Sequence, residues 1–101
     1  MRNIISLYEY LHDLSETFDD DKYVLMSMLS YAFVFARRVS LSSDSCYRCS
    51  CSMIDVEYTI FDSLICAERG RCGESIFLVR LAALRIENII SRCNNGKVDK
   101  G

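Results

Sequence analysis

The pattern of hydrophobic and polar residues divides the chain into four segments with helical periodicity. In the first segment, apolar residues recur at steps of three and four, the spacing of one face of an α-helix. These residues are Ile4, Leu7, Leu11, Leu14 and Phe18. Asn3 precedes them and is a candidate N-cap. The pattern therefore predicts a first helix that ends at a turn over Thr17–Asp21.

The second segment contains an uncharged stretch of 14 residues, Tyr23–Ala36. Acids at 19–21 precede it and Arg37 and Arg38 follow it, an order that suits the helix dipole. Two short strands are an alternative, but no turn signal divides the stretch. We predict a helix over Lys22–Val39, capped by Asp20 or Asp21. Because it is apolar nearly all round, we expect other helices or a partner chain to cover it on several sides.

The third segment follows the longest predicted connection, Ser40–Ser52, which contains six serines and three cysteines. Ser52 and Asp55 resemble a capping box, so we predict a helix that starts there and runs to Glu68, before Gly70. Its predicted core face is broad and comprises Met53, Ile54, Val56, Ile60, Phe61, Leu64, Ile65 and Ala67.

The fourth segment has the clearest apolar stripe of the chain. Gly73 and Glu74 open it, and its stripe consists of Val79, Ala82, Ala83, Ile86, Ile89, Ile90 and Cys93. The sequence 94–96, Asn-Asn-Gly, is a strong helix stop, which leaves 97–101 as a flexible tail. The four segments together predict an all-α fold: a compact, mostly antiparallel four-helix bundle in one domain, 1–96, with the helix at about 22–39 in the centre. The absence of proline fits long helices joined by short connections.

The fourth helix also carries a second apolar strip, nearly opposite its main stripe. Phe77, Leu81 and Leu84 form this strip, beside Arg80 and Asn88. A strip of this kind is either covered inside a compact bundle or used as a contact surface for another chain. We expect these five residues to form an interaction surface, with the three apolar side chains as its anchors.

The six cysteines leave three interpretations open. An up-and-down bundle brings the second connection and the end of the fourth helix to one pole, so four cysteines should lie near each other there: Cys46, Cys49, Cys51 and Cys93. Such a set is an alternative zinc site. Disulfides are a second interpretation, and free thiols, several of them buried, are the one we favour. Cys66 and Cys72 should lie at the opposite pole, where Cys72 near a helix start is the candidate residue of a thiol redox protein.

Residues suited to catalysis are few. His12 is the only histidine, and it lies off the apolar stripe with no evident relay partner at helical spacing. No glycine-rich phosphate loop is present. The sequence thus predicts a protein that is not an enzyme and needs no cofactor.

The balance of charge bears on the partner. The formal net charge is -2 and the charges are mixed along the chain, so nucleic acid is not an expected partner. The exception would be a zinc-stabilised module that contacts nucleic acid through Arg37, Arg38 and Arg48. Residues 37–40 also match a basophilic kinase site at Ser40.

The remaining features concern location and role. No secretory signal is visible, and the uncharged stretch is shorter than the roughly 20 residues of a membrane span, so we expect a cytoplasmic protein without a membrane span. The predicted role is a non-enzymatic interaction module that presents a helical face to a protein partner, to itself as a homodimer or larger homo-oligomer, or to both. Such a module could be a subunit of an assembly or a small regulator, including one encoded by a host or a phage.

Overall fold

A computed structural model describes residues 2–17, 21–41 and 47–100, with side chains described for 3–17, 21–41 and 52–92. All regular secondary structure in the described residues is α-helical. The helices are α1 (Arg2–Glu16), α2 (Lys22–Ser40), α3 (Tyr47–Glu68) and α4 (Cys72–Lys100). The predicted all-α, four-helix fold is confirmed.

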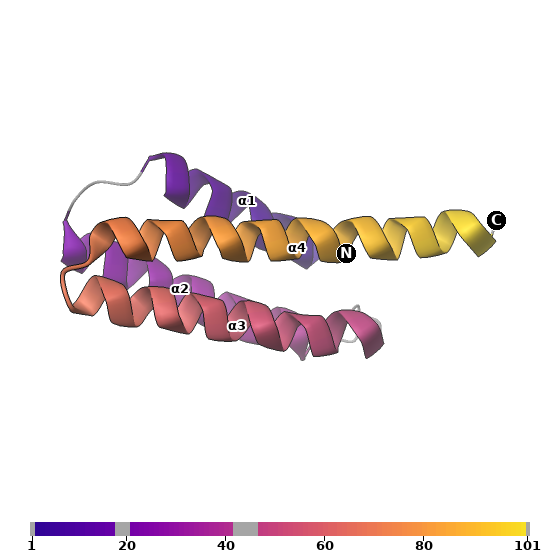
Figure 1. The fold of residues 1–101 in the computed structure, drawn as a ribbon. Coiled ribbons are helices and arrows are strands. Elements are labelled where there is room, and N and C mark those ends of the chain that lie inside the picture. The colour runs from indigo at the N-terminus through magenta and orange to yellow at the C-terminus, as the bar shows by residue number, and fades with distance from the viewer. Residues whose placement is uncertain (1, 18–20, 42–46, 101) are drawn as a thin grey trace.

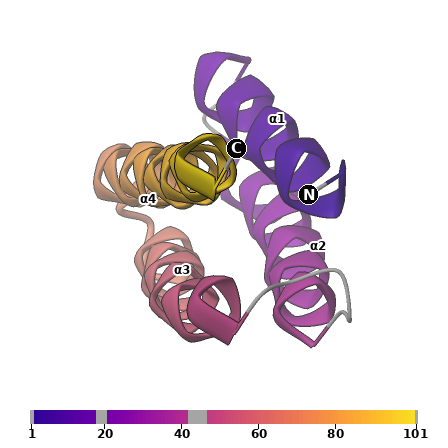
Figure 2. The same cartoon turned by 90° about the vertical axis from the view of Figure 1, so that its right-hand side faces the viewer.

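The helices form an up-and-down bundle in which each runs antiparallel to the one before it (Figure 1). Seen end-on, they occupy four corners in the order α1, α2, α3, α4 (Figure 2). Helix α3 packs extensively on both α2 and α4, whereas α1 packs more on α4 than on α2. The start of α3 and the C-terminal end of α4 lie at the same end of the bundle, as the predicted connectivity requires (Figure 1).

The core consists of the helical stripes that face the bundle axis. Burial of an aliphatic side chain stabilises the fold by about 1.5–3 kcal/mol, so these stripes supply most of the driving force. The buried hydrophobic residues are Ile4, Leu7, Leu11, Leu14, Leu25, Leu29, Ala32, Ala36, Val39, Met53, Val56, Ile60, Ala67, Ile76, Val79, Ala82, Ala83, Ile86 and Ile89. Two members of the predicted α3 face, Ile54 and Phe61, are instead exposed. The buried face of α3 is therefore rotated away from Ile54 and Phe61, and it includes two polar residues, Thr59 and Ser63.

Helix α2 is not covered on several sides. Its inner stripe is buried, but Tyr23, Val24, Tyr31 and Val34 point outward and are exposed. The reason is geometric: a helix at the corner of a four-helix bundle has two adjacent neighbours, which leave its outward side to solvent (Figure 2). Within one chain, the other helices therefore cover only the inner side of α2, and coverage of its outward side by a partner chain stays a prediction.

The N-terminus of α2 agrees with the prediction. Asp21 is the N-cap, and its Oδ1 accepts hydrogen bonds from the backbone N–H groups of Tyr23 (2.9 Å) and Val24 (3.4 Å). Asp20, the other predicted cap, lies outside the described residues. Arg37 and Arg38 occupy the last turn, where their positive charges interact favourably with the negative end of the helix dipole and stabilise the helix.

Three predicted helix ends are wrong. Helix α1 begins at Arg2, so Asn3 is inside the helix and does not cap it. Helix α3 begins at Tyr47, which places Ser52 and Asp55 within the helix rather than in a capping box. Helix α4 continues through residues 94–96 to Lys100. Asparagine and glycine lower helix propensity by no more than about 1 kcal/mol each, and without a contact that turns the chain they do not end a helix. The division into a 1–96 domain and a flexible 97–101 tail stays a prediction.

Gly70 ends α3 as predicted. Its φ of 80° is left-handed, a conformation that glycine adopts without a steric penalty. The Gly70 N–H donates to the Ala67 carbonyl (3.0 Å) and the Arg71 N–H to the Cys66 carbonyl (2.9 Å). This pair of bonds is a Schellman motif, which closes α3 and reverses the chain into α4.

Candidate interaction surfaces

The five predicted interaction residues lie along the outward side of α4. Phe77 and Leu84 are 68% and 52% exposed, Arg80 and Asn88 are exposed, and Leu81 is partly buried. We call these five residues the α4 surface. Residues 77, 81, 84 and 88 are three and four apart, so they follow one side of the helix. The buried stripe of α4, which includes Val79 and Ile86, occupies the other side.

The acids and bases of α4 differ in whether they have partners. The Glu74 carboxylate lies 3.7 Å from the Arg71 guanidinium, and the Glu87 carboxylate accepts a hydrogen bond from the Tyr8 hydroxyl of α1 (3.4 Å). Among the described residues, the guanidinium groups of Arg80 and Arg85 have no ion pair or hydrogen bond. Of the exposed charges beside Phe77 and Leu84, the two without a partner among the described residues are therefore the positive ones, Arg80 and Arg85.

The Tyr8–Glu87 contact also changes the chemistry of the tyrosine. Partial burial raises the pKa of Tyr8 above 10.0, and the negative charge of Glu87 and the hydrogen bond to it raise this pKa further. The phenol thus stays neutral and keeps donating to Glu87 at physiological pH. This contact fixes one edge of the α4 surface to α1.

A second exposed surface lies on the outward side of α2, the helix that the sequence predicts to be apolar nearly all round. We define this α2 surface by six exposed residues: Tyr23, Ser27, Ser30, Tyr31, Val34 and Arg38. Tyr23, Tyr31 and Val34 are 73%, 59% and 49% exposed. The uncharged stretch contained the signal for this surface, because it places apolar residues on both sides of the helix. The core of a small bundle buries only one of these sides.

Aromatic contacts border the α2 surface on both sides. Towards α1, the ring of Tyr10 lies 5.2 Å from that of Tyr31, which lies 6.1 Å from the ring of Phe35. Towards α3, the ring of Phe33 lies 5.9 Å from that of Phe61. These contacts hold the edges of the surface in place.

The hydroxyl of Tyr10 anchors the edge of the α2 surface that faces α1. This hydroxyl donates a hydrogen bond to the Met28 carbonyl of α2 (3.0 Å). Burial raises the pKa of Tyr10, and the nearby Tyr31 hydroxyl raises it further. The neutral phenol is therefore the form that joins α1 to α2.

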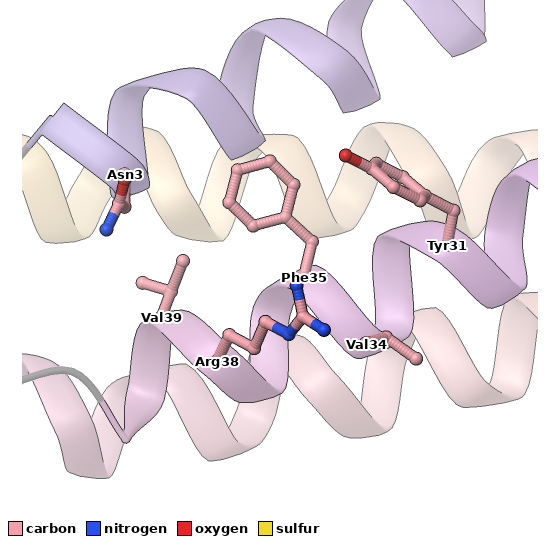
Figure 3. Close-up of a pocket in the computed structure, with 6 residues that line it drawn as sticks. All are labelled: Asn3, Tyr31, Val34, Phe35, Arg38 and Val39. Carbon is pink, nitrogen blue, oxygen red and sulfur yellow. The ribbon is translucent and has the colours of Figure 1, made fainter.

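A groove of about 270 Å³ runs beside the α2 surface. Figure 3 shows Asn3 projecting from α1, while the other residues that line the groove come from α2, with Phe35 and Val39 directed towards α1. The lining residues are Asn3, Tyr31, Val34, Phe35, Arg38 and Val39. Arg38 is the charged residue among them, so the groove combines an apolar floor with one cation.

His12 lies on the exposed side of α1. Its side chain is 49% exposed, as expected of a solvated residue. It does have a partner at helical spacing that the sequence analysis missed, since its Nε2 lies 3.3 Å from the Glu16 carboxylate. Exposed pairs one helical turn apart contribute little more than about 0.5 kcal/mol, so this contact belongs to the surface of α1.

The side chains of the predicted zinc set lie outside the described part of the chain. Cys46 lies outside the described residues, and the side chains of Cys49, Cys51 and Cys93 do as well. Zinc binding by these four residues stays a prediction. No cluster of histidine, cysteine and carboxylate side chains suited to a metal occurs in the part of the chain that is described. Cys66 is a free thiol, and Cys72 opens α4 and packs against the core.

Ser40, the predicted kinase acceptor, is the last residue of α2. Its hydroxyl donates to the Arg37 carbonyl (3.0 Å), and the preceding Val39 is buried in the core. The residues of this motif are therefore held in a helix, and phosphorylation at this position stays a prediction.

No helix in the described ranges combines the length and hydropathy that crossing a membrane requires. Comparisons of the chain with protein-family models, curated proteins and solved structures found no match. The two exposed surfaces are therefore the features of the molecule that bear on its function.

Proposed function

We propose that this protein is a non-enzymatic interaction module whose α4 surface binds an acidic amphipathic helix of a target protein. The observation that supports it is the position of two exposed apolar anchors, Phe77 and Leu84, next to the unpartnered Arg80 and Arg85. A partner helix would place apolar side chains on Phe77, Leu81 and Leu84 and its carboxylates on the two guanidinium groups. A reducing compartment suits this role, since the free thiol of Cys66 is preserved there.

The size of the anchors supports binding by this surface. An aromatic side chain covers about 150–250 Å², so Phe77, which is 68% exposed, alone leaves more than about 100 Å² of apolar area in water. The binding energy of interfaces is concentrated in a few such residues. The arginines would add specificity and a faster encounter with an acidic partner rather than most of the affinity.

The test uses a displayed library of amphipathic helices of about three turns, with a fixed apolar stripe and flanking positions varied among Glu, Lys and Ser. We expect selection on the purified protein to enrich Glu at the flanking positions. Binding of the enriched peptides should weaken about tenfold in Phe77→Ala and should decrease with added salt, because the charges are exposed. Arg80→Glu should reverse the charge preference.

The matched control is Tyr23→Ala, which removes an equally exposed aromatic ring from α2. It should leave binding of the same peptides unchanged. Enrichment without a charge preference, or peptides whose binding is insensitive to Phe77→Ala, would contradict the proposal. Self-association is the other kind of interaction expected from the sequence, and it concerns the α2 surface.

A further inference from the structure

We infer that the α2 surface is a self-association site at which two copies of this chain pack antiparallel, α2 against α2, about a twofold axis between Ser27 and Ser30. This inference is independent of the proposed function, because it uses a different helix. It rests on the spacing, the charge order and the extent of the exposed residues of α2.

The spacing of the outward residues is that of a helix–helix seam. Positions 23, 27, 30, 34, 37 and 41 alternate steps of four and three, as in the seam of two packed helices. These residues are all exposed. Two of the inner positions are Ser27 and Ser30, whose small side chains permit the backbones of two helices to approach closely. The centre of the seam is therefore narrow, and the large side chains lie towards its ends.

The charge order of α2 is self-complementary only in the antiparallel arrangement. Asp21 is exposed at the N-terminus, and the exposed side chains of Arg37 and Arg38 stand at the C-terminus without a partner among the described residues. No acid occurs between residues 22 and 41. When two antiparallel copies are aligned with Ser27 opposite Ser30, Tyr23 of each lies opposite Val34 of the other, and Asp21 lies within one helical turn of Arg37 and Arg38 of the other. A parallel pair would place Arg37 and Arg38 of the two copies together, whereas the N-terminal end carries both Asp21 and Lys22.

The same register explains the groove beside α2. It brings the ring of Tyr23 from one copy over Val34 and Arg38 of the other, at the open side of the groove. The Tyr23 ring is 73% exposed, and Lys22 Nζ lies 5.3 Å from its centroid within the same chain. Arg38 of the other copy would approach the ring from its second face, a cation–π arrangement. Tyr23 would thus be the anchor residue, used twice in the dimer.

The available area is close to what a specific dimer needs. Helix α2 has 19 residues, or about 28 Å at about 1.5 Å per residue, and the bundle is 22 × 17 Å across. A strip of this length that spanned the 22 Å width of the bundle would measure at most about 600 Å² on each copy. The smallest stable interfaces bury about 1,200 Å² in total, so we expect a reversible dimer that forms at roughly micromolar concentration.

The experiment measures molar mass by sedimentation equilibrium across a wide range of protein concentration. We expect the wild-type chain to change from monomer to dimer as the concentration rises. Ser30→Arg should be monomeric throughout, because it places two like charges beside the axis. Tyr23→Ala should weaken the dimer about tenfold or more. Circular dichroism identifies any variant that fails to fold, and Val34→Lys replaces Ser30→Arg in that case.

Charge reversal tests the antiparallel register. Arg38→Glu should weaken the dimer about tenfold, because it places a negative charge within one helical turn of Asp21 of the other copy, and adding Asp21→Lys to it should restore association. Phe77→Ala, on α4, is the control and should dimerise like the wild type. A wild-type chain that stays monomeric at millimolar concentration, a dimer insensitive to Ser30→Arg, or a dimer lost in Phe77→Ala would overturn the inference. Peptide binding by the α4 surface is measured separately, so either proposal can fail while the other stands.

Discussion

Ser63 of α3 and Ser75 of α4 form a reciprocal buried clasp. Their hydroxyl oxygens lie 2.8 Å apart, and each hydroxyl oxygen also lies 2.8 Å from the backbone carbonyl oxygen of the other residue. Both side chains are fully buried. Two hydroxyl protons can make two of these three bonds at once, so both hydroxyls are satisfied in every arrangement that uses both protons.

The clasp joins the helices on either side of the Gly70 turn at a point where both must be close. A larger side chain at either position would separate α3 from α4. A serine without its partner would be a buried polar group with fewer hydrogen bonds. The two residues therefore determine both the spacing and the polarity of this part of the core.

The first prediction concerns this pair. Ser63→Ala should lower the free energy of unfolding by about 1 kcal/mol, because Ser75 keeps the Ser63 carbonyl as an acceptor and only one net hydrogen bond is lost. Ser75→Ala should behave alike. The double variant should cost less than the two single changes added together, since the remaining carbonyls keep their helical bonds. Urea unfolding of the four proteins measures the coupling, and Ser91→Ala on the exposed side of α4 is the control.

Strict additivity of the two single changes would show that the hydroxyls act independently. In that event the short oxygen–oxygen distance would have no energetic consequence. A loss well above about 3 kcal/mol in either single variant would instead point to a packing defect.

The stripes of the four helices were predictable because burial in a bundle repeats with the period of the helix. Leu7, Leu11 and Ile86 could be placed in the core from spacing alone. Ser63 and Ser75 could not, because a serine on a core stripe is recognised as a hydrogen-bonding residue only when the facing helix is known. The sequence pattern of one helix contains no information on its neighbour's register.

The surfaces were predictable to different degrees for a related reason. The α4 strip stands opposite a clear core stripe, so Phe77 and Leu84 could be recognised as outward residues. Helix α2 has apolar residues on both sides, and spacing did not show that Tyr31 and Val34 would face solvent. The helix starts at Arg2 and Tyr47 were missed because local capping signals at Asn3 and Ser52 are weaker than the packing that extends a helix.

The second prediction concerns the turn between α3 and α4. Gly70→Ala should lower the free energy of unfolding by about 1–2 kcal/mol, because alanine at a φ of 80° brings its Cβ against the backbone. The environment adds no clash, since a Cβ built at Gly70 meets nothing within 4 Å. The cost is thus conformational alone.

Gly73 provides the matched control three residues later. It lies in the first turn of α4 with an ordinary helical φ, and a Cβ there also meets nothing within 4 Å. Gly73→Ala should therefore raise the free energy of unfolding by about 0.5 kcal/mol, through reduced freedom of the unfolded chain. Chemical denaturation of both variants tests the pair, and equal effects of the same sign would contradict the role of the left-handed Gly70.

The last prediction concerns alkaline pH and Tyr10. The pKa of Tyr10 is raised in the folded protein, first by burial and then by the Tyr31 hydroxyl. A raised pKa means that folding favours the neutral phenol. The contribution to stability is therefore complete below the unfolded pKa, near 10, and is lost as the pH rises through the folded pKa. The hydrogen bond from the Tyr10 hydroxyl to the Met28 carbonyl is lost with the proton.

Tyr10→Phe should consequently behave differently at the two ends of this range. At pH 7 it should be about 1 kcal/mol less stable than the wild type, because the bond to Met28 is absent. Above pH 10 the wild type loses its advantage while the phenylalanine variant has no proton to lose at this position, so the difference should shrink. Urea unfolding of both proteins at closely spaced pH values between 7 and 11 measures this difference directly. A difference that stays constant across the range would show that Tyr10 ionises as easily in the folded chain as in the unfolded one, and would contradict the raised pKa.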